Sequence, residues 1–194
     1  MAAHPLASLV ERLCEAAALE PPALELRDPA QGPREFLATL DEAEQHVDAL
    51  KFLAHLLPPR EAVWWAWMCA RRQAGDDVGP EVQQALDDTE RWISQPTDQH
   101  RRAAMAAGEA AGFDTPAGCA ALAAFLSGGS LAPPEVTEVP PPLFGAARAV
   151  FGSLVLSAVA VEPEKAPERY KTFYAHGTEL ASRIRLWDSL APAP

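Results

Sequence analysis

The stretch "LPPREAVWWAWMCARR", residues 57–72, decides the fold class. Six consecutive positions within it hold three tryptophans, a methionine and a cysteine, and its charges are confined to the two ends. On a helical wheel the bulky side chains and alanines surround the middle of the segment, which is typical of a central helix buried on all sides. We therefore expect an all-α protein, with a core that includes Trp64, Trp65, Trp67 and Met68.

The same segment allows a second interpretation, in which its tryptophans form a binding surface. An exposed patch of three tryptophans favours aggregation unless a partner covers it, so the core interpretation is preferred and the binding one stays open. Arg71 and Arg72 suit the negative end of the helix dipole, whereas Arg60 stands at the unfavourable end. We predict that an acid of the preceding helix pairs with Arg60 or Arg71. All three arginines, Arg60, Arg71 and Arg72, are candidate partner-binding residues.

The remaining sequence also has a helical pattern. Apolar residues recur at i, i+3, i+4 and i+7, and no segment alternates for long enough to predict a strand. No repeat of fixed period is present, so we predict an irregular multi-helix bundle of about seven to nine helices. Prolines start several of these helices, Gly75 and Thr97 cap two others, and Asp41 is the expected N-cap of one. The expected helices outside the tryptophan segment are 5–19, a short turn at 34–40, 41–57, 80–95, 98–113, 116–126, 143–161 and 168–187.

The sharpest change of composition is "SGGSLAPPEVTEVPPP", residues 127–142. Its two glycines and five prolines predict a linker or an extended surface strap. The segment that follows, residues 143–161, is apolar nearly all round and needs neighbours on every side. We therefore expect residues 1–194 to form a single helical domain with 127–142 as an internal linker.

The chain carries a net charge of −11, and the first 100 residues hold 18 acids against 8 bases. An acidic surface does not suit nucleic acid, because phosphate binding depends on basic side chains. A basic protein partner is compatible with it. The densest acidic stretch supplies further candidate partner-binding residues: Asp76, Asp77, Glu81, Asp87, Asp88 and Glu90.

No pattern in the sequence predicts a catalytic, cofactor or metal site. Cys14, Cys69 and Cys119 are far apart and lie among apolar residues, so we expect buried thiols and a reducing cytoplasm. The histidines have no metal-ligand spacing, and neither a nucleophile elbow nor a phosphate loop is present. The first residues lack a basic region, which argues against a secretory signal, and Arg148 interrupts the longest apolar stretch, so we expect no membrane insertion. The five histidines are His4, His46, His55, His100 and His176.

Three motifs in order, "LPPREAVWWAWMCAR", "AAFLSGGSLAPPE" with the prolines after it, and "RYKTFYAHGTELA", resemble a family of small bacterial proteins of unknown function associated with type VI secretion gene clusters. The likeness covers roughly residues 40–182. It implies a cytoplasmic accessory role, such as an adaptor or chaperone for a secreted effector or spike component, and it brings no catalytic residues.

We therefore predict a non-enzymatic protein that acts by protein–protein interaction. One alternative is an immunity protein, whose acidity would suit a basic toxin. Another is a small-molecule-binding helical domain or cryptic enzyme with a pocket near the tryptophan helix.

Overall fold

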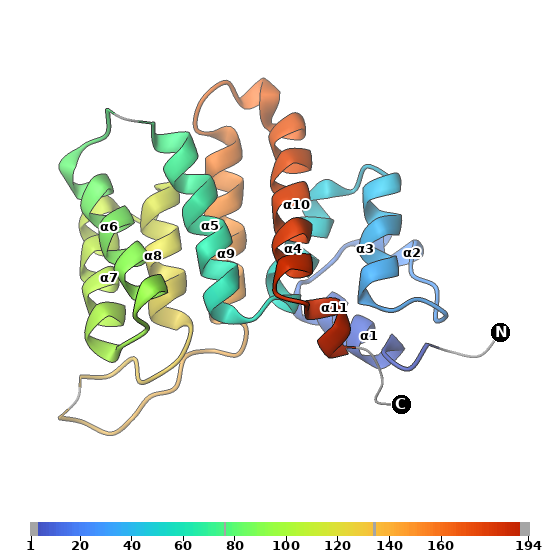
Figure 1. Cartoon of the computed structure of the whole chain (residues 1–194), viewed down its shortest axis with the longest axis horizontal. Coiled ribbons are helices and arrows are strands. Elements are labelled where there is room, and N and C mark those ends of the chain that lie inside the picture. Colours follow the sequence, from blue (N-terminus) through green and yellow to red (C-terminus); the bar gives the residue numbers. More distant parts are fainter. Residues whose placement is uncertain (1–3, 76, 134, 191–194) are drawn as a thin grey trace. The chain divides into compact units, whose positions relative to one another are not determined.

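A computed structural model describes residues 4–75, 77–133 and 135–190 of the chain (Figure 1). These residues form helices and no strand, so the prediction of an all-α multi-helix bundle is confirmed. Eleven α-helices lie within the described ranges, nine of them with seven or more residues.

By its internal contacts the chain divides into two compact units. Unit 1 comprises Met1–Leu57 and Pro167–Pro194, and unit 2 comprises Pro58–Ala166. Each unit is described here by itself, and the single-domain organisation expected from the sequence stays a prediction.

Unit 1 is built around the pairing of its third and fourth helices. The rings of Phe36 and Phe52 meet edge to face with centroids 5.1 Å apart, and Leu37 is fully buried beside them. The buried hydroxyl of Tyr174 donates to the carbonyl of Leu37 at 3.0 Å, which fixes the long C-terminal helix to the third. The helices of this unit are α1 (Ala7–Ala16), α2 (Pro21–Glu25), α3 (Pro33–Glu42), α4 (His46–Leu56), α10 (Ala166–Arg183) and α11 (Leu186–Leu190).

Two helix limits expected in this unit are wrong, and both errors have the same cause. The expected helix 41–57 is divided at Glu44, which has φ +57°, and Gln45 N–H closes the end of α3 by donating to the carbonyl of Leu40 at 2.8 Å. Asp41 is therefore not an N-cap. The expected helix 168–187 is divided at Arg185, with φ +56°. A helix break at a left-handed residue other than glycine cannot be recognised from the sequence pattern.

Unit 2 packs α8 between α7 and α9, and α5 against α6, α8 and α9 (Figure 1). The approach of α8 to α7 is close because the facing residues are small: a Cβ on Gly108 of α7 would lie 2.9 Å from the Cβ of Ala121 on α8. Gly75 has φ +69° where α5 ends, and the Thr97 hydroxyl accepts from His100 N–H at 3.2 Å, so both predicted caps are confirmed. The helices of this unit are α5 (Pro59–Ala74), α6 (Pro80–Ser94), α7 (Asp98–Ala111), α8 (Pro116–Leu126), α9 (Gly145–Val159) and the 3-10 helix η1 (Pro163–Lys165).

The proline-rich strap is held at its first residues by two arginines of α7. Arg101, only 4% exposed, donates to the carbonyls of Phe125 and Ser130 at 2.7 Å each and lies 4.5 Å over the Phe125 ring. Arg102 donates to the carbonyl of Ala132 at 2.7 Å. Asp98 accepts from both guanidinium groups, and these hydrogen bonds lower the pKa of its carboxyl. Figure 1 shows the strap running along the end of unit 2 where α7 begins and α8 ends.

Candidate functional site

The tryptophan segment forms α5, and its side chains differ in burial. Trp65 is fully buried, whereas Trp64, Trp67 and Met68 are half-buried. The indole N–H of Trp67 donates to the carbonyl of Leu86 on α6 at 2.9 Å. The bulky residues of α5 thus contribute to packing within unit 2.

The three candidate arginines of α5 have different surroundings. Arg60 Nε donates to the carbonyl of Ile93 at 2.7 Å, so a carbonyl near the end of α6 has the role that we had assigned to an acid. Arg71 donates to the carbonyl of Gly75 at 3.3 Å and to Oε1 of Gln83 at 3.2 Å. Arg72 is exposed. Carbonyls at a helix C-terminus carry partial negative charge, which accounts for the first two arginines locally.

The acidic candidates do not form one exposed patch. Asp88 is only 7% exposed and is bound within its own helix, by Gln84 Nε2 at 2.7 Å and by Arg91. Asp76 lies outside the described residues. Four acids remain exposed along and just before α6: Asp77, Glu81, Asp87 and Glu90.

The three cysteines are buried, and burial raises the pKa of each thiol. The pKa of Cys69 rises to about 12 and that of Cys14 to about 11, in both cases mainly because the thiolate would lose its hydration. Within the ranges that the structure describes, no three His, Cys, Asp or Glu residues lie together in a way that could hold a metal ion.

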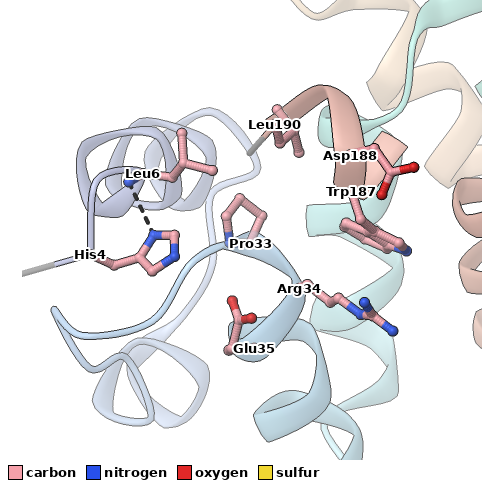
Figure 2. A pocket seen from close by; sticks show the side chains of 8 residues that line it. All are labelled: His4, Leu6, Pro33, Arg34, Glu35, Trp187, Asp188 and Leu190. Atoms are coloured by element: carbon pink, nitrogen blue, oxygen red, sulfur yellow. Dashed lines mark hydrogen bonds between the residues drawn. The ribbon is translucent and has the colours of Figure 1, made fainter. Parts of the chain in front are cut away.

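Unit 1 has a groove made of two neighbouring hollows that share Arg34 and Trp187. We call it the α3–α11 groove. The first hollow has a volume of about 270 Å³ and the second about 520 Å³. The first is lined by His4, Leu6, Pro33, Arg34, Glu35, Trp187, Asp188 and Leu190 (Figure 2). The second is lined by Arg34, Leu37, Ala38, Asp41, Glu42, Tyr174, Ala175, Thr178, Glu179, Ser182 and Trp187.

The first hollow brings together three parts of the chain that are distant in sequence. Figure 2 shows the residues before α1, the first turn of α3 and α11 facing one another. His4 is fixed because its backbone N–H donates to the carbonyl of Pro29 at 2.8 Å and its Nδ1 accepts from Leu6 N–H at 3.1 Å. A Cβ on Gly32 would lie 2.6 Å from the His4 ring, so only glycine allows this approach.

Trp187 and Arg34 line both hollows. The guanidinium carbon of Arg34 lies 5.9 Å from the centre of the Trp187 ring, within the range of a cation–π interaction. The indole N–H of Trp187 donates to the hydroxyl of Ser182 at 3.1 Å. The tryptophan is half-buried, so part of its ring faces the groove.

The rim of the groove is acidic. The carboxylates that line the groove outnumber its single guanidinium group, that of Arg34. Three of these carboxylates have partners. Glu35 accepts from Gly32 N–H at 3.1 Å, Asp41 accepts from His46 at 3.0 Å, and Glu179 binds Arg183 at 2.6 Å. The rim carboxylates are Glu35, Asp41, Glu42, Glu179 and Asp188.

Sequence reasoning did not predict this groove. It made Trp187 the last residue of a continuous helix, 168–187, which the structure divides at Arg185. His4 was weighed only as a metal ligand, and Arg34 was not considered at all. The one local signal was a tryptophan in "RLWDS", among polar residues at the end of a helical pattern.

The fold and the groove define an all-α protein of two compact helical units. The chain belongs to the family described as a family of unknown function (DUF6931), whose model matches residues 36–181. The predicted resemblance to an uncharacterised family is thereby confirmed, while its link with type VI secretion stays a prediction. No curated protein and no solved structure matches the chain.

In the described ranges no single helix has both the length and the apolar composition needed to cross a membrane. The helix α9 and the segment Pro163–Arg183 after it meet that test only as a pair separated by a bend.

Proposed function

We propose that this chain is a non-enzymatic interaction protein that binds a protein partner in the α3–α11 groove. The observation that carries the proposal is the pair of neighbouring hollows that are both lined by Trp187 and Arg34. Tryptophan and arginine are enriched among the residues that contribute most to protein–protein binding, particularly where they line a pocket. A groove with an apolar floor and a charged rim has the anatomy of such an interface.

The proposed role of the protein is that of an accessory protein, an adaptor or chaperone, in bacterial type VI secretion. This part of the proposal rests on the resemblance of the three sequence motifs. The cytoplasmic location and the identity of the partner as an effector or spike component are proposed on the same ground. The alternative of an immunity protein also requires a protein partner, which would bind in the same groove.

The second candidate function is binding of a small molecule. The volume of the larger hollow, about 520 Å³, favours it because it lies within the range of about 300–1,000 Å³ that is usual for ligand pockets, whereas the smaller hollow, about 270 Å³, lies just below that range. The groove lies in unit 1, away in sequence from the tryptophan helix where such a pocket was expected.

Affinity capture with matched variants tests the proposal. Ala38 is exposed and lines the larger hollow, so Ala38→Tyr fills the groove without a change of charge. Ala106, exposed on α7, provides the control Ala106→Tyr. We expect the wild-type chain and the Ala106→Tyr variant to retain the same protein from the native host and the Ala38→Tyr variant to lose it. Equal capture by both variants would contradict the groove as the binding surface.

The exposed acids of α6 are tested in the same experiment. Neutralising Glu81, Asp87 and Glu90 removes charge without touching the groove. If this variant loses the partner and Ala38→Tyr keeps it, the partner binds α6, as the sequence predicted, and not the groove.

A further inference from the structure

The charges on the rim of the α3–α11 groove indicate what kind of segment it accepts. Asp188 borders the first hollow and Glu42 the second. Both are exposed, and neither side-chain carboxylate has a hydrogen bond or ion pair with another of the described residues. The groove therefore offers uncompensated negative charge at both of its hollows.

The groove also has apolar lining at both hollows. Trp187 borders both hollows, Leu6, Pro33 and Leu190 line the first, and Leu37 and Ala38 line the second. Arg34 is held against the Trp187 ring and so carries the one guanidinium charge at the centre of the groove. A bound segment thus meets apolar surface and, at the border of each hollow, a carboxylate without a described partner.

We propose that the occupant is a protein segment that presents lysine or arginine side chains next to an apolar side chain. This proposal rests on the proposed function, since it specifies the partner of the same groove. The apolar side chain lies against Trp187, and the cations lie near Asp188 and Glu42. Opposite charges across an interface increase the association rate and exclude wrong partners, so an acidic segment is rejected.

Charge also argues against a second copy of this chain as the occupant. The protein carries a net charge of −11, so another copy brings mostly carboxylates to an acidic rim. Like charges placed opposite each other across an interface are destabilising. A basic partner brings the opposite charge to the rim, so this repulsion does not arise.

Two synthetic peptides of equal length and equal apolar content test the proposal, one carrying lysines and the other glutamates at the same positions. The readout is the indole N–H signal of Trp187 in NMR spectra of the full chain. Trp187 is the only tryptophan in unit 1, because the other four lie between residues 58 and 166. We expect the lysine peptide to shift this signal and to bind about tenfold more tightly than the glutamate peptide, which corresponds to about one net favourable charge pair.

The variant Glu42→Gln with Asp188→Asn removes the two uncompensated charges of the rim. The matched control, Glu81→Gln with Glu90→Gln, removes the same charge from α6. We expect the rim variant to bind the lysine peptide about tenfold more weakly and the control to bind it like the wild type.

Three results would overturn the proposal. Equal binding of both peptides, with the Trp187 signal shifted by each, leaves the groove as a protein-binding surface but removes its preference for basic segments. Equal weakening by the rim variant and the control assigns the effect to the net charge of the protein. A Trp187 signal that moves with protein concentration in the absence of peptide assigns the groove to a second copy.

Discussion

Arg101 is the residue with the densest set of polar contacts described in unit 2. Its guanidinium group joins the start of α7 to the end of α8 and to the first residues of the strap through Asp98, Phe125 and Ser130. It is almost completely buried, so these bonds are shielded from water. The side chain therefore explains how a segment rich in glycine and proline follows α8 in a fixed position.

Replacing Arg101 with alanine is expected to lower the free energy of unfolding by about 2–3 kcal/mol, because the buried carbonyl of Phe125 loses its charged donor and the carbonyl of Ser130 loses one of two. Chemical denaturation measures this loss. The control is Arg72→Ala, since Arg72 is exposed at the end of α5 and should change stability by less than about 0.5 kcal/mol. Equal effects of the two substitutions would show that Arg101 does not hold the strap.

The three cysteines are expected to resist alkylation in the folded protein. Burial raises the pKa of Cys69 from 9.0 to about 12 and that of Cys14 from 9.0 to about 11, so the reactive thiolate is scarce at pH 8. Mass spectrometry after iodoacetamide treatment should detect labelling in denaturant and none in buffer over the same time. Rapid labelling of any of the three in the folded chain would contradict their structural role.

The same pKa shifts determine how these thiols affect stability at high pH. A group whose pKa is higher in the folded state than in the unfolded state stabilises the fold below the unfolded pKa and loses that contribution as the pH rises. The window for Cys14 and Cys69 therefore runs from about pH 9 to pH 11–12. We expect the melting temperature to fall across this window, and replacing Cys69 with alanine to reduce the fall.

At the scale of elements, the break between α10 and α11 sets the position of Trp187. Arg185 has φ +56° at this break, a conformation that costs a residue other than glycine about 1 kcal/mol or more. We expect Arg185→Gly to stabilise the protein by about 0.5–1 kcal/mol, whereas Lys171→Gly, at an exposed position in the interior of α10, should destabilise it by about 1 kcal/mol. Thermal unfolding of both variants measures the difference, and destabilisation of equal size in both would show that the two helices are continuous.

The elements that could be predicted from sequence are those with local causes. Three helices start at a proline, because the N–H that proline lacks is one that the first helical turn leaves unpaired in any case. These prolines are Pro59, Pro80 and Pro116. Thr97 caps α7 through its own hydroxyl. Glu44 and Arg185 could not be predicted as breaks, since both are ordinary helix residues whose left-handed conformation depends on packing.

The groove could not be predicted for a related reason. It forms only when the residues before α1, the first turn of α3 and the last turn of the chain that the structure describes come together. No spacing in the sequence relates His4 to Arg34 or either of them to Trp187. The tryptophan segment, by contrast, was recognisable as a helix because its whole pattern lies within sixteen residues, although the expected burial on all sides holds for Trp65 and not for Trp64, Trp67 or Met68, which are half-buried.

At the scale of the whole molecule, unit 2 is a continuous piece of the chain with its own core. Val63, Leu86 and Val150 are fully or almost fully buried within it, and each of its helices packs against others of the same unit. We expect a fragment of residues 58–166 to be helical and to unfold cooperatively. Circular dichroism during thermal unfolding measures this. A fragment without a cooperative transition would support the single domain that the sequence predicted.

The central claim is that the α3–α11 groove binds a protein. Site-specific photo-crosslinking in the native host tests it most directly, with a photoreactive residue at Ala38 in the groove and, as control, at Ala106 on α7. We predict a discrete crosslinked protein from position 38 and none from position 106. Crosslinking that is absent at position 38, or the same at both positions, would contradict the claim.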